Sequence, residues 1–181
     1  MPQKYNRRSI RLVGYDYSLD GLYFITICTK NRLHQFGEII NGEMILNDNG
    51  KIALQELKNT EKIRNGDVIL HSHIVMPNHV HFILQIVNPC RGVPRTPIAN
   101  NDGNVGVCNT PLRSPSKTVG SIVRGYKCSV SHRLGFSVWQ RNYFEHIIRT
   151  SKSYEIISNY ILSNPLKWDT DCMNVLLVRP S

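Results

Sequence analysis

The chain has 181 residues, of which 41% are hydrophobic, and this size fits a single domain with its own core. Its 22 Lys and Arg against 13 Asp and Glu give a net charge of +9, which favours a polyanionic partner such as nucleic acid. No run of roughly 18 apolar residues occurs, and the basic N-terminus lacks the apolar centre of a secretory signal. The five cysteines include no C-x-x-C pair, which argues against a structural zinc or redox motif. We therefore expect one cytoplasmic domain over residues 1–181, with no membrane partner.

The first half of the chain predicts a strand, a hairpin, a helix and two further strands. "GLYFITICT" (21–29) is β-branched and aromatic, as a buried strand is, and the Asn41-Gly42 pair suits a type I′ hairpin turn. Residues 47–64 have helical spacing of apolar positions, with Asn47 or Asp48 as the N-cap. "DVILHSHIVM" and "NHVHFILQIV" then predict two strands that separate at residues 76–78.

The second half begins with a long irregular loop at 88–115, which is rich in proline, asparagine and glycine. A helix is predicted next, because six apolar residues fall on one helical face: Val119, Ile122, Val123, Tyr126, Val130 and Leu134. "SVWQRNYFEHIIR" (137–149) predicts a strand. The last helix, "TSKSYEIISNYILSN", has Thr150 or Ser151 as its cap, and Pro165 should end it by disfavouring helical geometry at Asn164.

This order predicts an α+β fold. When the hairpin and the last helix are set aside, the elements read β-α-β-β-α-β, which is the ferredoxin-like arrangement. We expect a sheet with its helices on one face, so that the other face or its edge is available for a site. The hairpin and the C-terminal helix are additions to that arrangement.

His79 and His81 lie two residues apart on a strand, so their side chains point to the same side, about 7 Å apart along the backbone. Two imidazoles at this separation can bind one metal ion, although two histidines on a half-exposed strand face are the commoner case. Tyr160 and Asn164 are four residues apart on the last helix and therefore share a face. For Tyr160 alone, an aromatic residue that packs on the sheet is a commoner case than a nucleophile.

Together these segments carry a resemblance to a known family. The chain resembles the single-tyrosine HUH transposases, and within them the REP-associated tyrosine transposases that are similar to insertion-sequence enzymes. The resemblance rests on "RRSIRLVGYDYS", "GLYFITICT", "VMPNHVHFIL", "GSIVRGYK", "VWQRNYFEHIIR" and "YILSNPLKW". It covers nearly the whole chain outside the loop at 88–115 and the last dozen residues. "MPNHVH" combined with "Y-I-x-x-N-P" is its most specific part.

The resemblance implies roles for particular residues. His79 and His81 match the family's metal ligands for Mg²⁺ or Mn²⁺, and Tyr160 matches its nucleophile. Asn164 matches the third ligand, where relatives often carry the longer Gln. The implied reaction is cleavage of single-stranded DNA through a 5′-phosphotyrosine, followed by strand transfer, on repeats that form hairpins. Related enzymes work as homodimers or as monomers, and the sequence leaves both open.

Basic and aromatic residues are expected to guide the DNA strand. The candidate phosphate contacts are Arg7, Arg8, Arg11, Arg124, Lys127, Arg141 and Arg149. Trp139, Tyr143 and Phe144 could stack on unpaired bases, with core packing expected for at least two of them. His71 and His73 repeat the spacing of the metal pair but precede Pro77, so we expect a supporting or structural role. His146 could also support the site.

Two other functions fit parts of the sequence. A ferredoxin-like fold with a basic surface is also a nucleic-acid-binding platform, so the chain could be a catalytically silent protein that binds DNA hairpins. A metal hydrolase would need a third strong ligand, and no Asp or Glu stands at a suitable spacing. The intact set of His79, His81 and Tyr160 favours the transposase reaction over both.

Overall fold

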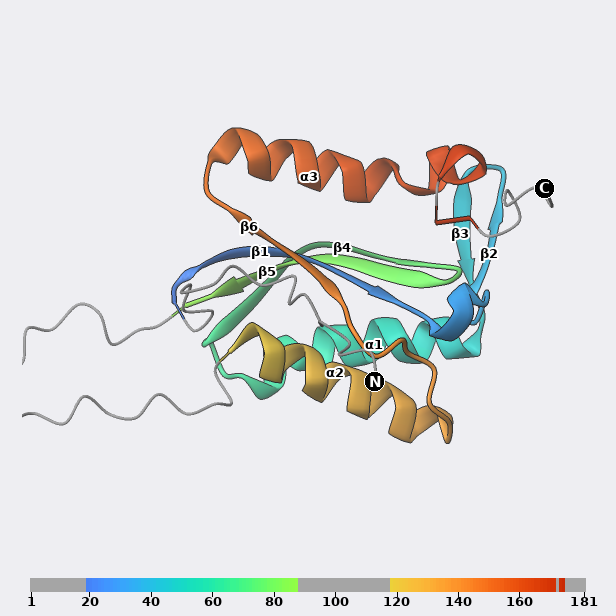
Figure 1. The fold of residues 1–181 in the computed structure, drawn as a ribbon, viewed down its shortest axis with the longest axis horizontal. Coiled ribbons are helices and arrows are strands. Elements are labelled where there is room, and N and C mark those ends of the chain that lie inside the picture. The colour runs from blue at the N-terminus through green and yellow to red at the C-terminus, as the bar shows by residue number, and fades with distance from the viewer. Residues whose placement is uncertain (1–18, 88–117, 172, 175–181) are drawn as a thin grey trace, which may run out of the picture.

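The computed structural model describes residues 19–87, 118–171 and 173–174 of the chain (Figure 1). Four strands form one antiparallel sheet in the order β4-β5-β1-β6: β1 (Gly21–Cys28), β4 (Val68–Met76), β5 (His79–Ile86) and β6 (Phe144–Ile148). A separate hairpin consists of β2 (Gly37–Ile40) and β3 (Glu43–Leu46). The helices are α1 (Asp48–Ile63), α2 (Val119–Leu134) and α3 (Ser151–Ser163), with short 3₁₀ helices η1 (Lys30–Arg32) and η4 (Pro165–Thr170).

The predicted ferredoxin-like arrangement is confirmed. Helix α1 connects β1 to β4 with β5 between them, and α2 connects β5 to β6 with β1 between them. Each helix therefore crosses over one antiparallel strand, as in the β-α-β-β-α-β motif. Strands β1 and β5 occupy the centre of the sheet, and β5 is the strand that carries His79 and His81.

The molecule has three layers, and the face of the sheet opposite α1 and α2, which is the face expected to be available for a site, carries His79 and His81 and is partly covered by α3. Helices α1 and α2 cover one face, and α3 lies over the other (Figure 1). Helix α3 is held there because Ile161, which is fully buried, packs with Phe24, Ile83 and Ile148 of the sheet. The candidate residues on β5 therefore lie between the sheet and α3.

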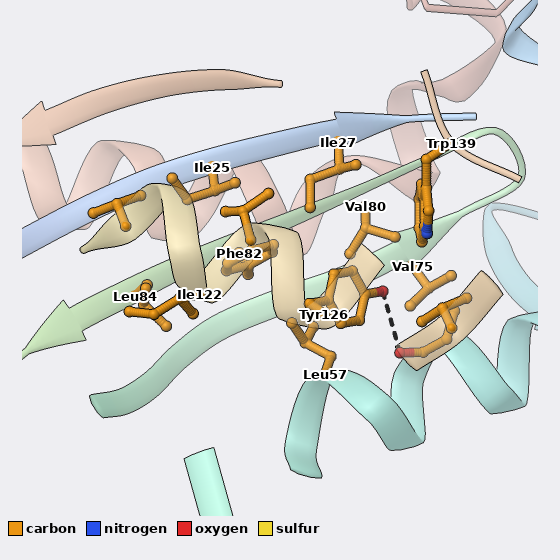
Figure 2. Close-up of a cluster of buried hydrophobic side chains, with 14 of the residues drawn as sticks. Ile25, Ile27, Leu57, Val75, Val80, Phe82, Leu84, Ile122, Tyr126 and Trp139 are labelled. Carbon is orange, nitrogen blue, oxygen red and sulfur yellow. Dashed lines mark hydrogen bonds between the residues drawn. The ribbon is translucent and has the colours of Figure 1, made fainter. Parts of the chain in front are cut away.

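The main core fills the space between the sheet and the helices α1 and α2 (Figure 2). Alternate residues of β5 point into it, as the sequence predicts: Val80, Phe82, Leu84 and Ile86. Tyr126 of α2 is buried in this core, and its hydroxyl donates to the carbonyl of Ala53 on α1 at 3.2 Å. Because most of the large apolar side chains of β5 point to this face, its other face can carry polar residues beside Ile83.

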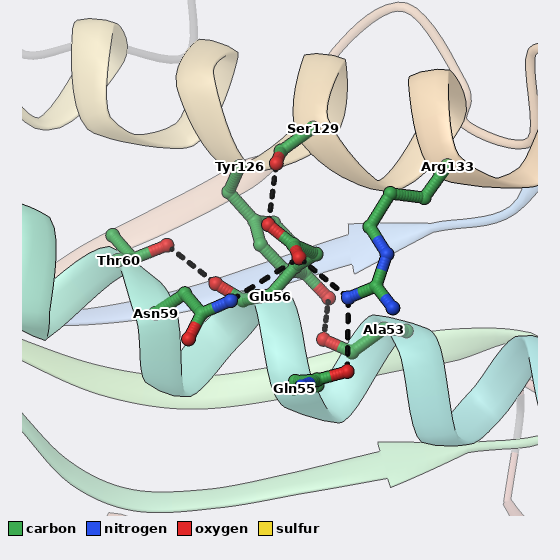
Figure 3. A network of polar contacts seen from close by, with 8 residues as sticks. All are labelled: Ala53, Gln55, Glu56, Asn59, Thr60, Tyr126, Ser129 and Arg133. Atoms are coloured by element: carbon green, nitrogen blue, oxygen red, sulfur yellow. Dashed lines mark hydrogen bonds and ion pairs between the residues drawn. The ribbon is translucent and has the colours of Figure 1, made fainter.

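A polar network joins α1 to α2 outside this core (Figure 3). The buried Glu56 carboxylate accepts hydrogen bonds from Ser129, from Arg133 at 2.8 Å and from Asn59 at 3.2 Å. Burial acts to raise the pKa of Glu56, but these hydrogen bonds and the charge of Arg133 outweigh it and lower the pKa. The carboxylate is therefore stabilised in its charged form at the helix pair.

Most local signals in the sequence are confirmed. Asn47 caps α1 by accepting from the Gly50 amide at 2.9 Å, and Thr150 caps α3 through the Ser153 amide at 3.1 Å. Asn41 and Gly42 have φ values of 53° and 77°, as a type I′ turn requires.

One predicted boundary is wrong. The strand predicted at 137–149 is a strand only from Phe144 to Ile148, with Trp139 forming an isolated bridge to Thr29. The last helix ends at Ser163 with Asn164 as its C-cap, as predicted, but Asn164 keeps helical angles (φ −58°, ψ −42°), because Pro165 starts η4, where its missing N–H needs no partner.

The predicted loop at 88–115 and the basic residues Arg7, Arg8 and Arg11 lie outside the described residues. Among the helices that the structure does describe, none is long and apolar enough to cross a membrane.

Candidate active site between the sheet and helix α3

The two histidines of β5 lie side by side under α3. His79 and His81 are 0% and 3% exposed, and their ring centroids are 4.4 Å apart. Their side chains leave the sheet on the face opposite Val80 and Phe82, as the alternation of a strand requires. The site is therefore buried, and it is built on a central strand whose position is fixed by hydrogen bonds on both sides.

The orientation of the His79 ring follows from its contact with Asn78. The side-chain amide of Asn78 donates to the carbonyls of Arg32 and Met173 at 3.2 and 2.8 Å, so its Oδ1 is left to accept. His79 Nδ1 lies 2.8 Å from that oxygen and must donate to it. The Nε2 atom then carries the lone pair, and it is buried without a hydrogen-bond partner. A buried imidazole nitrogen in this state is ready to bind a metal ion.

His81 is held in a similar way. Its Nδ1 lies 2.8 Å from the hydroxyl of Thr26, which is the residue opposite it on β1. Its Nε2 lies 3.4 Å from the hydroxyl of Tyr160. Thr26 thus contacts one nitrogen of the ring, and the other nitrogen faces the candidate nucleophile.

Both imidazoles are neutral in this environment. Burial, aided by the charge of Arg32, lowers the pKa of His79 to about 3. Burial also lowers the pKa of His81 well below its ordinary value, and the neighbouring His79 lowers it further, against an opposing effect of Asp171. Neutral imidazoles keep the lone pair that a metal ligand needs.

Helix α3 carries Tyr160, and Asn164 follows as its C-cap. Tyr160 is 39% exposed, and its ring centroid lies 5.3 Å from that of His81. Asn164, one turn later, is 2% exposed, and its Oδ1 is buried without a hydrogen-bond partner. Trp168 of η4 follows one further turn on and lies 6.0 Å from His79 between ring centroids. Asn164 therefore stands between a residue that contacts His81 and one that contacts His79.

The donor set suits a divalent cation. His79 Nε2 and Asn164 Oδ1 are buried polar atoms without partners, which is costly unless a ligand satisfies them. Together with His81 Nε2 they offer two imidazole nitrogens, which suit transition-metal ions, and one amide oxygen, which suits harder ions such as Mg²⁺ and Mn²⁺. The described residues contain no cluster of three His, Cys, Asp or Glu that could hold a metal. An amide ligand such as Asn164 falls outside that class of site.

Sequence reasoning missed three residues around the site, namely Thr26, Asn78 and Trp168. Asn78 directly precedes His79 and could have been suspected as its partner. Thr26 becomes recognisable only from the strand register that places it opposite His81. Trp168 covers His79 and also contacts His34, whose ring centroid lies 5.6 Å away. Its role depends on the turn from α3 into η4, which the spacing does not predict.

The other histidines have different surroundings. His71 contacts Gln85 through Nε2 at 2.8 Å and the hydroxyl of Tyr154 through Nδ1 at 3.3 Å. His73 donates from Nδ1 to the carbonyl of His71 at 2.8 Å. His71 therefore belongs to the contact between β4 and α3, whereas His73 lies opposite Phe82 in the strand register, on the α1 and α2 side of the sheet. His146 is exposed on β6, where it lies opposite Phe24 of β1.

The candidate DNA-binding residues divide into separate groups. Arg124 and Arg141 are exposed and line an open pocket of about 770 Å³ beside α2, on the side of the sheet away from the histidines. Lys127 lies there too, but its ammonium group donates to the carbonyls of Gln140, Arg141 and Asn142 at 2.6–3.3 Å. The three N–H donors of Lys127 thus hold the loop at residues 140–142. Arg149 is exposed between β6 and α3.

The chain was compared with known proteins and solved structures. The chain is 41% identical over 185 residues to an uncharacterized protein from Haemophilus influenzae, covering 97% of this chain and 99% of that protein. A solved structure of a REP-associated tyrosine transposase bound to a REP hairpin matches with a TM-score of 0.56 at 19% identity, over 87% of this chain and 74% of that chain. A candidate transposase from Deinococcus radiodurans gives a TM-score of 0.39 at 17% identity, over 84% and 95% of the two chains, which is too low to support an argument. No family model matches the chain. The fold is thus similar to that of the REP-associated transposase.

Proposed function

We propose that this chain, which belongs to one family with the uncharacterized Haemophilus influenzae protein, is a transposase-like enzyme that cleaves and rejoins single-stranded DNA through Tyr160. One observation carries the proposal. The hydroxyl of Tyr160 lies 3.4 Å from Nε2 of His81, which with His79 forms a neutral, buried pair, and Asn164, one helical turn after Tyr160, has a buried amide oxygen without a hydrogen-bond partner. Similarity in fold to a transposase solved with a REP hairpin supports the same class of substrate.

The metal-binding part of the proposal assigns three ligands. His79 Nε2, His81 Nε2 and Asn164 Oδ1 would hold one Mg²⁺ or Mn²⁺ ion. When bound there, such an ion neutralises charge on the scissile phosphate and favours the deprotonated phenol. The chain itself orients the two imidazoles through Asn78 and Thr26 and excludes water with Trp168.

Tyr160 then acts as the nucleophile. Its oxygen attacks the phosphorus of a DNA phosphodiester, and the bond from phosphorus to the 3′ oxygen breaks. The departing strand leaves as a free 3′-hydroxyl after taking up a proton, and the other strand stays attached as a 5′-phosphotyrosine. Attack by a different 3′-hydroxyl reverses the step and joins two strands. No water and no redox reagent are consumed, so the sequence of steps is a strand transfer.

The substrate is proposed to be a single strand or the unpaired flank of a hairpin. One tyrosine can cut only one strand at a time, and Tyr160 is partly exposed while the metal ligands below it are buried. Exchange between two DNA ends could use two copies of the chain. That homodimer stays a prediction, which light scattering on the DNA complex would test.

The decisive experiment is trapping of the covalent intermediate. The purified chain is incubated with Mn²⁺ and 5′- or 3′-labelled hairpin oligonucleotides that carry unpaired flanks, and the products are separated in denaturant. We expect a covalent protein–DNA adduct that carries the 3′ label and lacks the 5′ label, because Tyr160 stays attached to the strand on the 3′ side of the cut. Tyr160→Phe should abolish it, whereas Tyr143→Phe should retain it, because Tyr143 packs against the core on the opposite side of the sheet.

The outcomes separate the candidate functions. Cleavage that persists in Tyr160→Phe would exclude the proposed nucleophile. Binding of hairpin DNA without cleavage, under each metal and flank sequence supplied, would instead support a DNA-hairpin-binding protein.

A further inference from the structure

We propose that Phe144 of β6 is a stacking platform for the nucleobase beside the phosphate that Tyr160 attacks. This inference rests on the proposed function, because it assigns the position of the DNA strand at the same site. It concerns the half of the site that α3 does not cover, next to the edge strand of the sheet.

The exposure of Phe144 separates it from its aromatic neighbours. Trp139 is 7% exposed and Tyr143 is half-buried, and both pack with the core between the sheet and helices α1 and α2. Phe144 is 48% exposed, although it lies in a strand whose next residue, Glu145, is buried. Of these three candidates for stacking, Phe144 alone has an accessible ring.

The position of Phe144 ties it to the reacting groups. In the sheet register Phe144 lies opposite Thr26, which contacts His81. The Phe24 ring links Phe144 to the reacting residues. Its centroid lies 6.2 Å from that of Phe144, 6.2 Å from that of Tyr160 and 5.3 Å from that of His81. Its contact with Phe144 is T-shaped, which leaves at least one face of the Phe144 ring open. A base on that face would be a close neighbour of the phosphate at Tyr160.

The surrounding surface fits an unpaired strand of DNA better than an apolar partner. His146, two residues further along β6, is also exposed and points to the same side. Phenylalanine and histidine rings are both used to stack unpaired bases. Helix α3 packs mainly on β4 and β5, and on the β6 side of this face Phe144 and His146 remain exposed. On this face β1 and β6 present no carboxylate that would repel a phosphate: their residues are Leu22, Phe24, Thr26, Cys28, Phe144, His146 and Ile148.

The inference can be tested by base-stacking fluorescence, with the Tyr160→Phe protein to prevent cleavage. The probe is a DNA hairpin with unpaired flanks, into which 2-aminopurine is placed one flank position at a time. We expect quenching at one or two adjacent positions. Phe144→Ala should remove that quenching and weaken binding about tenfold, as expected for the loss of one base stack. Phe144→Trp should restore both.

A matched control and two contrary outcomes make the test sharp. Phe136→Ala changes a similarly exposed phenylalanine, at 45%, which follows α2 on the other side of the sheet, and it should change neither quenching nor affinity. Unchanged quenching in Phe144→Ala would overturn the stacking role. If the wild-type chain forms no covalent adduct but the quenching still depends on Phe144, the nucleophile proposal fails and the stacking inference stands.

Discussion

The orientation of each histidine ring is fixed by the residue that contacts its Nδ1 atom. Asn78 and Thr26 do this for His79 and His81, both at 2.8 Å. The two Nε2 atoms are thereby directed away from the sheet strands that hold the rings. Such outer contacts set ring orientation and basicity in metal sites.

Replacement of Thr26 by valine tests this arrangement. Valine keeps the shape and suits a strand, so the fold should survive, but the hydroxyl beside His81 is removed. We expect the affinity for Mn²⁺ to fall about 10–100-fold. The electron paramagnetic resonance signal of free Mn²⁺ during a titration measures it. Thr60→Val is the control, because Thr60 donates to Glu56 of α1 on the far side of the sheet. Equal affinities of Thr26→Val and the wild type would contradict the role of Thr26.

Helix α3 positions Tyr160 and Asn164 through a small set of contacts. Ile161 packs into the sheet, and polar contacts join Tyr154 to His71 and Ser158 to Ser72 of β4. Tyr160 and Asn164 project from the adjacent stretch of the helix, one over His81 and the other buried. Because these contacts join successive turns of α3 to the sheet, the register of α3 along the sheet determines where the tyrosine hydroxyl lies.

The α1–α2 pair on the opposite face depends on Glu56. We expect Glu56→Gln to lower the free energy of unfolding at neutral pH by about 1–3 kcal/mol, since a buried charged hydrogen-bond acceptor is removed. The folded pKa of Glu56 is lower than its ordinary value of 4.5, so its contribution is fully present above that pH. The contribution should then disappear as the pH falls from about 4.5 through the folded pKa.

Urea denaturation of the wild type and Glu56→Gln between pH 7 and pH 3 measures this effect. The stability difference should be largest at neutral pH and should shrink toward acid. Glu43→Gln is the control, because Glu43 is exposed on the hairpin strand β3. A difference that grows toward acid would show that the pKa of Glu56 is not lowered on folding.

At the scale of the whole molecule, the sequence predicts the fold better than it predicts the surroundings of the site. The β-α-β-β-α-β order and the shared face of His79 and His81 follow from periodicity, which acts over a few residues. The position of α3 over the second face does not follow, because it depends on Ile161 meeting residues far away in the chain. The contact between Thr26 and His81 could not be predicted either, because it depends on the strand register. Nor could the role of Lys127, whose ammonium group donates to the carbonyl of Gln140 in a later loop.

The distribution of basic residues predicts how DNA binding depends on salt. Arg124 and Arg141 border a pocket beside α2, on the opposite side of the sheet from Tyr160. Contacts of these arginines with DNA would be made to its phosphates. Replacing both by Gln should weaken DNA binding to a similar extent for different flank sequences. It should also reduce the slope of log affinity against log salt concentration by about 0.7–0.9 for each phosphate that the variant no longer neutralises.

Fluorescence anisotropy of labelled hairpins between low and moderate salt measures that slope. The control is the double variant Lys51→Gln and Lys58→Gln, which removes the same charge from exposed positions on α1. It should leave the slope nearly unchanged, because salt screens the attraction between DNA and charges that do not contact it. If the two double variants lose affinity and slope equally, the pocket beside α2 makes no specific phosphate contacts and the net charge of +9 attracts the DNA as a whole. A selective loss in the arginine variant would mean that the chain binds its DNA on both faces of the sheet, with the duplex or distal flank on the α2 side and the reacting strand beside α3.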